Sequence, residues 1–223
     1  MPVRSTMPGT SKGTSKETSS DDLSQVPVRL KIVQAGEPVL RQIARPLTPE
    51  EIAHPAIQEL IDHMRDTMRD APGVGLAAPQ IGLGIQIAVV EDRPDYLAGI
   101  APELLAQRER QPVPFMVLIN PAIVEYSDET LEFFEGCLSV AGFSALVKRS
   151  RRVAVEYLDE HAQPRRIEAS GWFARILQHE IDHLQGFLYI DRMATRSFTN
   201  LDNMGRHWKD LPVESVRAAL GLS

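Results

Sequence analysis

The sequence predicts an α+β fold with a mainly antiparallel sheet. An amphipathic helical pattern ends near residue 70, a series of short strand-like runs fills residues 85–169, and a second helical pattern begins at residue 171. Turn residues separate several of these runs, as they do in antiparallel sheets. Helices placed before and after such a series, rather than alternating with the strands, are typical of the α+β class.

The first helix is predicted to begin after Thr48. The sequence Thr48-Pro49-Glu50-Glu51 combines a capping threonine, a proline at the first helical position and a glutamate that completes a capping box. Pro55 restarts the helix, which is expected to run to about Asp70. Its core-facing stripe recurs every three or four positions and consists of Ile57, Leu60, Ile61, Met64 and Met68.

The expected strands are bounded by turn residues, among them Asn120-Pro121, Ser127-Asp128 and Asp159-Glu160. They are residues 85–91, 115–120, 123–127, 147 together with 153–158, and 165–169. A second helix is expected over residues 171–185, where apolar side chains return at helical spacing and Gly186 can end the helix. A short strand at residues 187–190 and a last helix at Val213–Leu220 complete the prediction.

Charge and cysteine content narrow the class of protein. The chain has 24 Lys and Arg against 30 Asp and Glu, a net charge of −6, and no basic block, so no direct nucleic-acid partner is expected. Its single cysteine excludes an internal disulfide and points to a reducing compartment. No apolar run approaches the length of a membrane helix, so no membrane partner is expected.

The first 25 residues differ in composition from the rest of the chain. They are rich in Ser, Thr and Lys and have few large apolar residues, so residues 1–25 are predicted to be a disordered tail and residues 26–223 one domain. The tail has no apolar segment of the signal-peptide kind. Its acidic residues and single Arg4 disfavour an organellar transit peptide, so a cytoplasmic location is expected over an organellar matrix.

His179-Glu180-Ile181-Asp182-His183 is the strongest local signal in the chain. On a helix, residues four apart lie about 40° apart around the axis and about 6 Å apart along it, so both imidazoles can reach one metal ion. Glu180 lies beside that face and can accept a proton from a metal-bound water. The pattern predicts a catalytic metal site on the second helix.

Two histidines leave such a site one protein ligand short. The metzincin pattern would place a third histidine at position 189, which is Tyr189 here. An acidic ligand further downstream, such as Glu214, is one candidate. The other is the only cysteine, Cys137, within Glu135-Gly136-Cys137-Leu138-Ser139, which could instead be a buried structural thiol or a nucleophile.

A glycine-rich cluster follows the first helix, from Gly73 to Gln80. It follows a helix rather than a strand and lacks the Lys and Ser/Thr of a P-loop, so a phosphate-binding loop is rejected. Its small residues would let a backbone approach a peptide ligand closely. Gln80 brings a side-chain amide donor into the same neighbourhood.

Together and in this order, the three clusters resemble the peptide deformylase family. The family pattern is Gly-apolar-Gly-apolar-Ala/Ser-Ala-x-Gln, then Glu-Gly-Cys-apolar-Ser, then Gln-His-Glu-x-x-Asp-His-Leu-x-Gly, and residues 73–80, 135–139 and 178–186 match it. The likeness spans about residues 28–200 and is nearest to the branch that includes mitochondrial and plastid enzymes. One departure is Ala141, where many bacterial members have proline. The resemblance implies mainly antiparallel sheets packed around a central metal-binding helix in a single catalytic domain.

The resemblance also implies a reaction and a site. The substrate would be the N-formylmethionyl end of a nascent polypeptide at the ribosome, and the products formate and a free amino terminus. The ion would be Fe²⁺, with Zn²⁺ or Ni²⁺ possible. The implied metal ligands are Cys137, His179 and His183; the implied catalytic groups are Glu180, Gln80 and the Leu138 backbone N–H; the implied substrate contacts are Val74, Gly75, Trp172 and Ile176.

Two other classes of function compete with this interpretation. A zinc peptidase of the His-Glu-x-x-His type would take its third ligand downstream and would bind metal without Cys137. A non-enzymatic metal-binding or peptide-binding module would lack a working acid–base group. The presence of both Glu180 and Gln80 argues against the second class.

Overall fold

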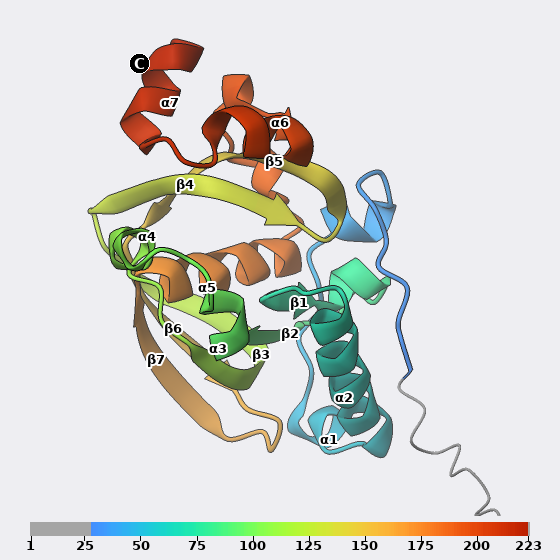
Figure 1. The fold of residues 1–223 in the computed structure, drawn as a ribbon. Helices are drawn as coiled ribbons and strands as arrows, with labels where there is room; N and C mark the ends of the chain where they lie inside the picture. Colours follow the sequence, from blue (N-terminus) through green and yellow to red (C-terminus); the bar gives the residue numbers. More distant parts are fainter. Residues whose placement is uncertain (1–27, 223) are drawn as a thin grey trace, which may run out of the picture.

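Two antiparallel sheets enclose one long helix, α5 (Gly171–Leu184), in residues 28–222, the part of the chain that this computed structural model describes (Figure 1). The first sheet has the strand order β1-β2-β3-β6-β7 and the second the order β4-β5-β8. Every strand pair is antiparallel. The predicted α+β class, with sheets around a central helix, is confirmed. The predicted tail, residues 1–25, lies outside the described residues.

The strands of the first sheet are β1 (Gly75–Ala77), β2 (Ile87–Asp92), β3 (Val113–Tyr126), β6 (Arg152–Leu158) and β7 (Pro164–Ser170). The second sheet consists of β4 (Thr130–Cys137), β5 (Val140–Ser150) and β8 (Thr199–Asn200). β1 lies at the edge of its sheet and pairs only with β2 among the described residues. The other side of the β1 backbone has no strand partner within residues 28–222.

The helices before the first sheet follow the prediction. α1 (Pro49–Ile52) begins with the expected capping box, in which the Glu51 N–H donates to Thr48 Oγ1 and the Thr48 N–H to Glu51 Oε2. α2 (Pro55–Asp70) buries Met64 and Met68 against the first sheet. The remaining helical segments are α3 (Pro94–Leu97), α4 (Pro102–Arg108), α6 (Leu201–Asn203), a π-helical turn Met204–Trp208, α7 (Val213–Leu220) and short 3₁₀ turns, among them Pro38–Arg41, Ala78–Ile81 and Tyr189–Asp191.

The central helix α5 is buried along nearly its whole length. Its apolar side chains, such as Leu177 and Ile181, pack with Val90, Leu118 and Val155 of the first sheet. Figure 1 shows β4 and β5 on the opposite side of α5. A helix covered on two sides can hold polar groups away from the surface, and of its two histidines His183 is buried and His179 half-buried. Within residues 28–222, none of the helices has the length and apolar character that crossing a membrane requires.

Residues 115–120 and 123–127, predicted as two strands, form one continuous strand, β3. Asn120 takes a left-handed conformation (φ 51°), and the pairing register with β6 shifts between Ile119 and Ala122. The Asn120 side chain accepts a hydrogen bond from the Leu47 N–H (2.9 Å) and donates one to the Leu47 carbonyl (2.8 Å). The Asn-Pro pair therefore makes a bulge inside a strand rather than a turn between two strands.

The strand predicted at residues 187–190 is wrong. Leu188 and Tyr189 are buried, but the chain there turns into a 3₁₀ segment, Tyr189–Asp191. The Leu188 N–H donates to the Asp191 carboxylate (2.8 Å) instead of to a neighbouring strand. The apolar character of this run reflects burial and not sheet pairing, since Tyr189 packs with Ala145 and Val147 of β5.

The hairpin β4–β5 is the main element that the sequence prediction missed, since only Val147 was assigned to it. Phe133 pairs with Val147 and Glu135 with Ala145 in this hairpin. Charged residues at strand positions such as Glu135 and Arg149 interrupt the apolar alternation that marks a half-buried strand. In the folded protein these two side chains are buried and paired with each other. The helix predicted at Val213–Leu220 is confirmed as α7.

Candidate metal centre and active site

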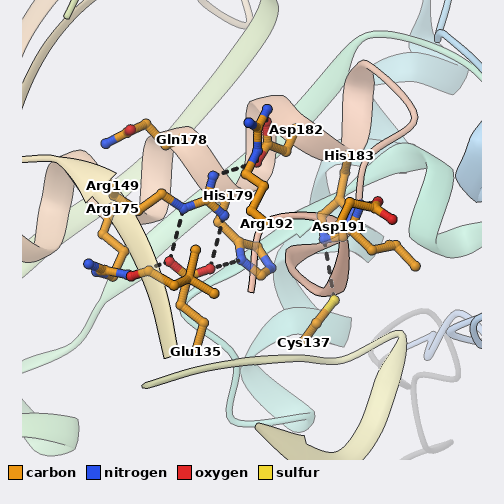
Figure 2. A network of polar contacts seen from close by, with 12 residues as sticks. Glu135, Cys137, Arg149, Arg175, Gln178, His179, Asp182, His183, Asp191 and Arg192 are labelled. Atoms are coloured by element: carbon orange, nitrogen blue, oxygen red, sulfur yellow. Dashed lines mark hydrogen bonds and ion pairs between the residues drawn. The ribbon is translucent and has the colours of Figure 1, made fainter. Parts of the chain in front are cut away.

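Cys137 and the two histidines of α5 meet between the sheets. The Cys137 Sγ lies 3.3 Å from His183 Nε2, and the two imidazole rings stand edge to face with centroids 4.9 Å apart (Figure 2). The donor atoms of Cys137, His179 and His183 all lie within 4.8 Å of one another. Within residues 28–222 this is the one such group of His, Cys, Asp or Glu side chains that could hold a metal ion.

The hairpin β4–β5 brings Cys137 to the helix. Cys137 is the last residue of β4, where the pairing register shifts between Gly136 and Cys137. Its sulfur accepts hydrogen bonds from the Ser139 N–H and from Gln80 Nε2, each 3.4 Å long. Both donors point at the sulfur that would bind a metal ion, and the thiolate is the form of cysteine that does so.

The Glu135 carboxylate holds the His179 imidazole through its Nδ1 atom. Its Oε2 lies 3.0 Å from His179 Nδ1, which leaves Nε2 of that ring directed toward Cys137 and His183 (Figure 2). Carboxylate partners of this kind fix the tautomer and orientation of metal-binding histidines. Burial opposes a charged Glu135, but the hydrogen bond with His179 and the charge of Arg149 outweigh it and hold the pKa of Glu135 well below its ordinary value. Burial lowers the pKa of His183, which favours a neutral imidazole.

A buried ion-pair network, which the sequence analysis missed, supports Glu135. Arg149 donates two hydrogen bonds to the Glu135 carboxylate (3.0 and 2.9 Å), and Arg175 donates a third (2.6 Å). Arg149 also pairs with Asp182, which accepts two hydrogen bonds from Arg192 (2.6 Å each). The charges thus alternate from the candidate metal ligand toward the surface (Figure 2).

Glu180 directly follows His179 on α5. It is only 4% exposed, and its Oε2 has no hydrogen-bond partner among residues 28–222. Burial raises the pKa of Glu180 to about 7. A buried carboxylate with one oxygen free and a pKa near neutrality is suited to taking up and giving back a proton.

Gln80 approaches the same centre from the glycine-rich segment. Its side-chain oxygen accepts a hydrogen bond from the Ala77 N–H (2.9 Å), which directs Nε2 toward Cys137 Sγ and Ser139 Oγ at 3.4 Å each. Leu138 lies in the turn that joins β4 to β5, directly after Cys137. The structure therefore brings together the two predicted oxyanion donors and the three predicted metal ligands.

A cavity of about 440 Å³ opens beside this centre. Gln80, Cys137, His179 and Glu180 reach it, and so do all four residues predicted to contact substrate, namely Val74, Gly75, Trp172 and Ile176. Phe143 and Leu201 also line the cavity and were missed. Leu201 follows the region of the predicted resemblance, and Phe143 lies in the missed hairpin, so no local pattern marked either residue.

The alternative third ligands lie elsewhere. Glu214 is an exposed residue on α7 and does not belong to the group of donor atoms around the two histidines. The ring of Tyr189 stacks near His179, with centroids 6.4 Å apart, but Tyr189 lies outside that group as well. Within residues 28–222, Cys137 is the side chain that completes a three-ligand set.

Comparisons with known proteins agree with this geometry. The family model described as polypeptide deformylase matches residues 29–198. The chain is 46% identical to "Peptide deformylase 1A, chloroplastic/mitochondrial" of Arabidopsis thaliana over 191 residues, which cover 86% of this chain and 69% of that protein. It is 45% identical to "Peptide deformylase 3" of Streptomyces avermitilis over 194 residues, or 87% of this chain and 84% of that protein.

A solved structure shares the fold. The Met-Ala-Ser-bound class I type b peptide deformylase of Acinetobacter baumannii aligns with a TM-score of 0.67 and 33% identity, covering 75% of this chain and all of that one (100%). The match of the family model over most of the chain, the level of identity and the shared fold lead to one conclusion. The chain belongs to the polypeptide deformylase family.

Proposed function

We propose that Cys137, His179 and His183 hold the metal ion of this enzyme and that Glu180 transfers the protons of its reaction. As a member of its family, the chain is a metal-dependent hydrolase that removes the N-formyl group from nascent polypeptides. The observation that carries the residue assignment is the meeting of three metal-binding side chains beside a cavity that Glu180 also lines, a buried carboxylate whose Oε2 has no hydrogen-bond partner among residues 28–222.

The residues fit a divalent ion. One sulfur and two imidazole nitrogens suit Fe²⁺, Zn²⁺ or Ni²⁺, and Glu135 already fixes the orientation of His179. When bound, such an ion polarises the formyl carbonyl and lowers the pKa of a coordinated water. Resemblance to the family favours Fe²⁺ as the resident ion.

Glu180 is the proton carrier in this proposal. It takes a proton from the water that attacks the formyl carbon, and it later gives a proton to the nitrogen of the breaking C–N bond. The products are formate and a free amino terminus. The Glu180 side chain lines the cavity, and no hydrogen bond to another residue occupies its Oε2, so the carboxylate is available for both transfers.

Gln80 and Leu138 would stabilise the oxygen that gains negative charge. The Gln80 side-chain amide is held rigidly through its own oxygen, so its N–H can point at this oxygen without reorganising. The backbone N–H of Leu138 would be the second donor. Both groups flank Cys137 and lie beside the same cavity.

The edge strand β1 would bind the peptide substrate. One side of β1 has no strand partner within residues 28–222, and an extended peptide can add to such an edge through backbone hydrogen bonds. This arrangement would run the substrate past Val74 and Gly75 toward Glu180. Trp172 and Ile176, on the first turns of α5, would contact the methionine side chain.

Partners and location follow from the substrate. Formylated chains emerge from ribosomes, so we expect the enzyme to act there. The Arabidopsis relative has a chloroplastic/mitochondrial name, whereas the Streptomyces relative is bacterial. The cytoplasmic location expected from the sequence is therefore one of two options, a bacterial cytoplasm or an organellar matrix. Microscopy of the full chain with a C-terminal tag in its own cell would distinguish them.

Formate release from formyl-Met-Ala tests the proposal. The protein is purified anaerobically, its metal is analysed, and the apo-protein is reloaded with Fe²⁺, Zn²⁺ or Ni²⁺. We expect formate and intact Met-Ala as products, with the Fe²⁺ form the most active and sensitive to air. Cleavage of the Met-Ala bond without formate release would instead identify a peptidase.

A further inference from the structure

A short N-terminal segment, residues 33–35, connects the two loops that carry the proposed oxyanion donors. The Val33 N–H donates to the Gln80 carbonyl (2.8 Å), and the Ala35 N–H donates to the Ser139 carbonyl (2.7 Å). The residue between them, Gln34, also contacts the second loop through its side chain. This segment precedes all three sequence motifs and lies more than a hundred positions from Ser139 and Leu138 in the chain.

The Gln34 side chain brackets the turn that follows Cys137. Its Nε2 donates to the Leu138 carbonyl (3.0 Å), and its Oε1 accepts from the Ala141 N–H (3.2 Å). Both hydrogen bonds reach backbone atoms of one turn, at its beginning and just beyond its end. Gln34 itself is exposed, so its side chain contributes no buried core.

Glycines flank the turn. Gly136 precedes Cys137, and Gly142, in a left-handed conformation (φ 82°), follows Ala141. Glycine restricts the backbone less than other residues do, so hydrogen bonds from outside the turn contribute to its geometry. A proline at position 141 would stiffen the turn but has no N–H to donate. Ala141 keeps its N–H, and the hydrogen bond to Gln34 uses it.

We propose that Gln34 is a positioning residue for the deformylation reaction: by holding the turn Leu138–Ala141 it keeps the Leu138 N–H directed at the reacting oxygen. The N–H and the carbonyl of Leu138 share one Cα atom, so fixing the direction of the carbonyl limits the directions open to the N–H. The inference rests on the proposed function, because the Leu138 N–H matters only if an oxyanion forms beside it. Gln34 does not line the cavity, and neither of its two side-chain hydrogen bonds goes to a proposed metal ligand.

Two variants and one control test this role in the full, metal-loaded chain. Gln34→Ala removes both hydrogen bonds. Gln34→Glu keeps an acceptor for the Ala141 N–H but places a carboxylate oxygen against the Leu138 carbonyl. Gln42→Ala makes the same truncation at an exposed glutamine of the same N-terminal region, whose side chain has no hydrogen-bond partner among residues 28–222.

We expect kcat for formate release from formyl-Met-Ala to fall about tenfold in both Gln34 variants, since small displacements of catalytic groups are costly. KM, bound metal per chain and melting temperature should stay at wild-type values, and Gln42→Ala should match the wild type throughout. Because Gln34→Glu retains one of the two hydrogen bonds, an equal loss there would assign the effect to the Leu138 carbonyl.

Three results would overturn the inference in an enzyme that does release formate. Wild-type kcat in Gln34→Glu would show that the turn keeps its geometry without the donor. A rise in KM alone would make Gln34 a substrate-binding residue, and a loss of metal would make the segment a support for Cys137. If the wild-type protein released no formate at all, the proposed function itself would fail, and this inference with it.

Discussion

Gly75 and Glu180 lie in direct contact across the active site. A β-carbon added to Gly75 would lie 2.1 Å from Glu180 Oε1 and 2.5 Å from its carboxyl carbon, which is too close for atoms that are not bonded to each other. The absence of a side chain at position 75 is therefore what lets the edge strand β1 approach the buried carboxylate. In the proposed mechanism, β1 has two roles. It binds the peptide, and it packs against Glu180, the side chain that transfers the protons.

Gly75→Ala should disable Glu180 without unfolding the protein. The new methyl group can be accommodated only if the Glu180 carboxylate turns away, because Glu180 is the side chain that it meets. We expect kcat for formate release to fall by about 10²-fold or more, the scale of losing a general acid–base group. Metal content should stay the same, as measured by elemental analysis.

Gly84→Ala is the matched control for this variant. Gly84 is exposed, and a β-carbon there would meet nothing within 4 Å. Its kcat should equal that of the wild type. An active Gly75→Ala enzyme would mean that Glu180 can work from a second position, and the close contact would have no catalytic meaning.

The metal helix could be predicted from the sequence because its signal is local. Helical periodicity alone places His179 and His183 on one face, and the capping residues around Thr48 fix the start of the first helix in the same way. Gly75 and Glu180 are more than a hundred positions apart, so their contact depends on how β1 packs against α5. No pattern within either segment encodes that packing.

Buried charged residues are the second reason why the sequence prediction differs from the structure. Glu135 and Arg149 are each about 5% exposed, yet in the sequence they look like the charged residues of a solvated loop. A strand with charged residues inside is stable only when its partners arrive from elsewhere, here Arg175 and His179 from α5. The sequence prediction therefore missed the β4–β5 hairpin and, with it, the positions of Phe143 and the network around His179.

Glu135→Gln should destabilise the fold. The substitution leaves Arg149 and Arg175, both buried, without their shared carboxylate. Breaking a buried ion pair from one side costs about 3–5 kcal/mol. Urea denaturation should show that the free energy of unfolding falls by about this amount. Glu156→Gln, which removes an exposed carboxylate paired with Arg166, should change stability by less than about 1 kcal/mol.

The contribution of Glu135 to the free energy of unfolding should also depend on pH, and it should decrease in acid. The folded-state pKa of Glu135 is depressed, so its stabilisation is complete above the ordinary glutamate pKa of about 4.3 and declines as pH falls below it. The difference in free energy of unfolding between the wild type and Glu135→Gln should therefore be constant near neutral pH and should become smaller in acid. A difference that grew in acid would contradict the assigned cause of the pKa shift.

Gln80→Leu and Gln80→Glu test the oxyanion donor. Both remove the side-chain N–H, but Glu keeps an acceptor for the Ala77 N–H and so preserves the local fold. Loss of one such donor usually costs about 10²–10³ in kcat, with a smaller effect on KM. Steady-state kinetics on formyl-Met-Ala would check this. An increase in KM with kcat unchanged would make Gln80 a residue that only positions the substrate.

Cys137→Ser should lose most of its metal, because an alcohol is far less acidic than a thiol and a harder donor. Glu214→Ala should keep its full content of bound metal, since Glu214 lies outside the group of donor atoms. Competition with a chromophoric chelator would measure both affinities. The reverse pattern would favour a peptidase with a downstream ligand over the present assignment.

The most direct measurement is formate release by metal-loaded Glu180→Gln beside the wild type. Gln has the shape of Glu, so it fits the same buried space against Gly75, but it cannot carry the proton. The account predicts wild-type metal content and a loss of about 10²–10⁴ in kcat for formate release from formyl-Met-Ala. Formate release near the wild-type rate by the fully metal-loaded variant would contradict the account, because proton transfer would then not pass through Glu180.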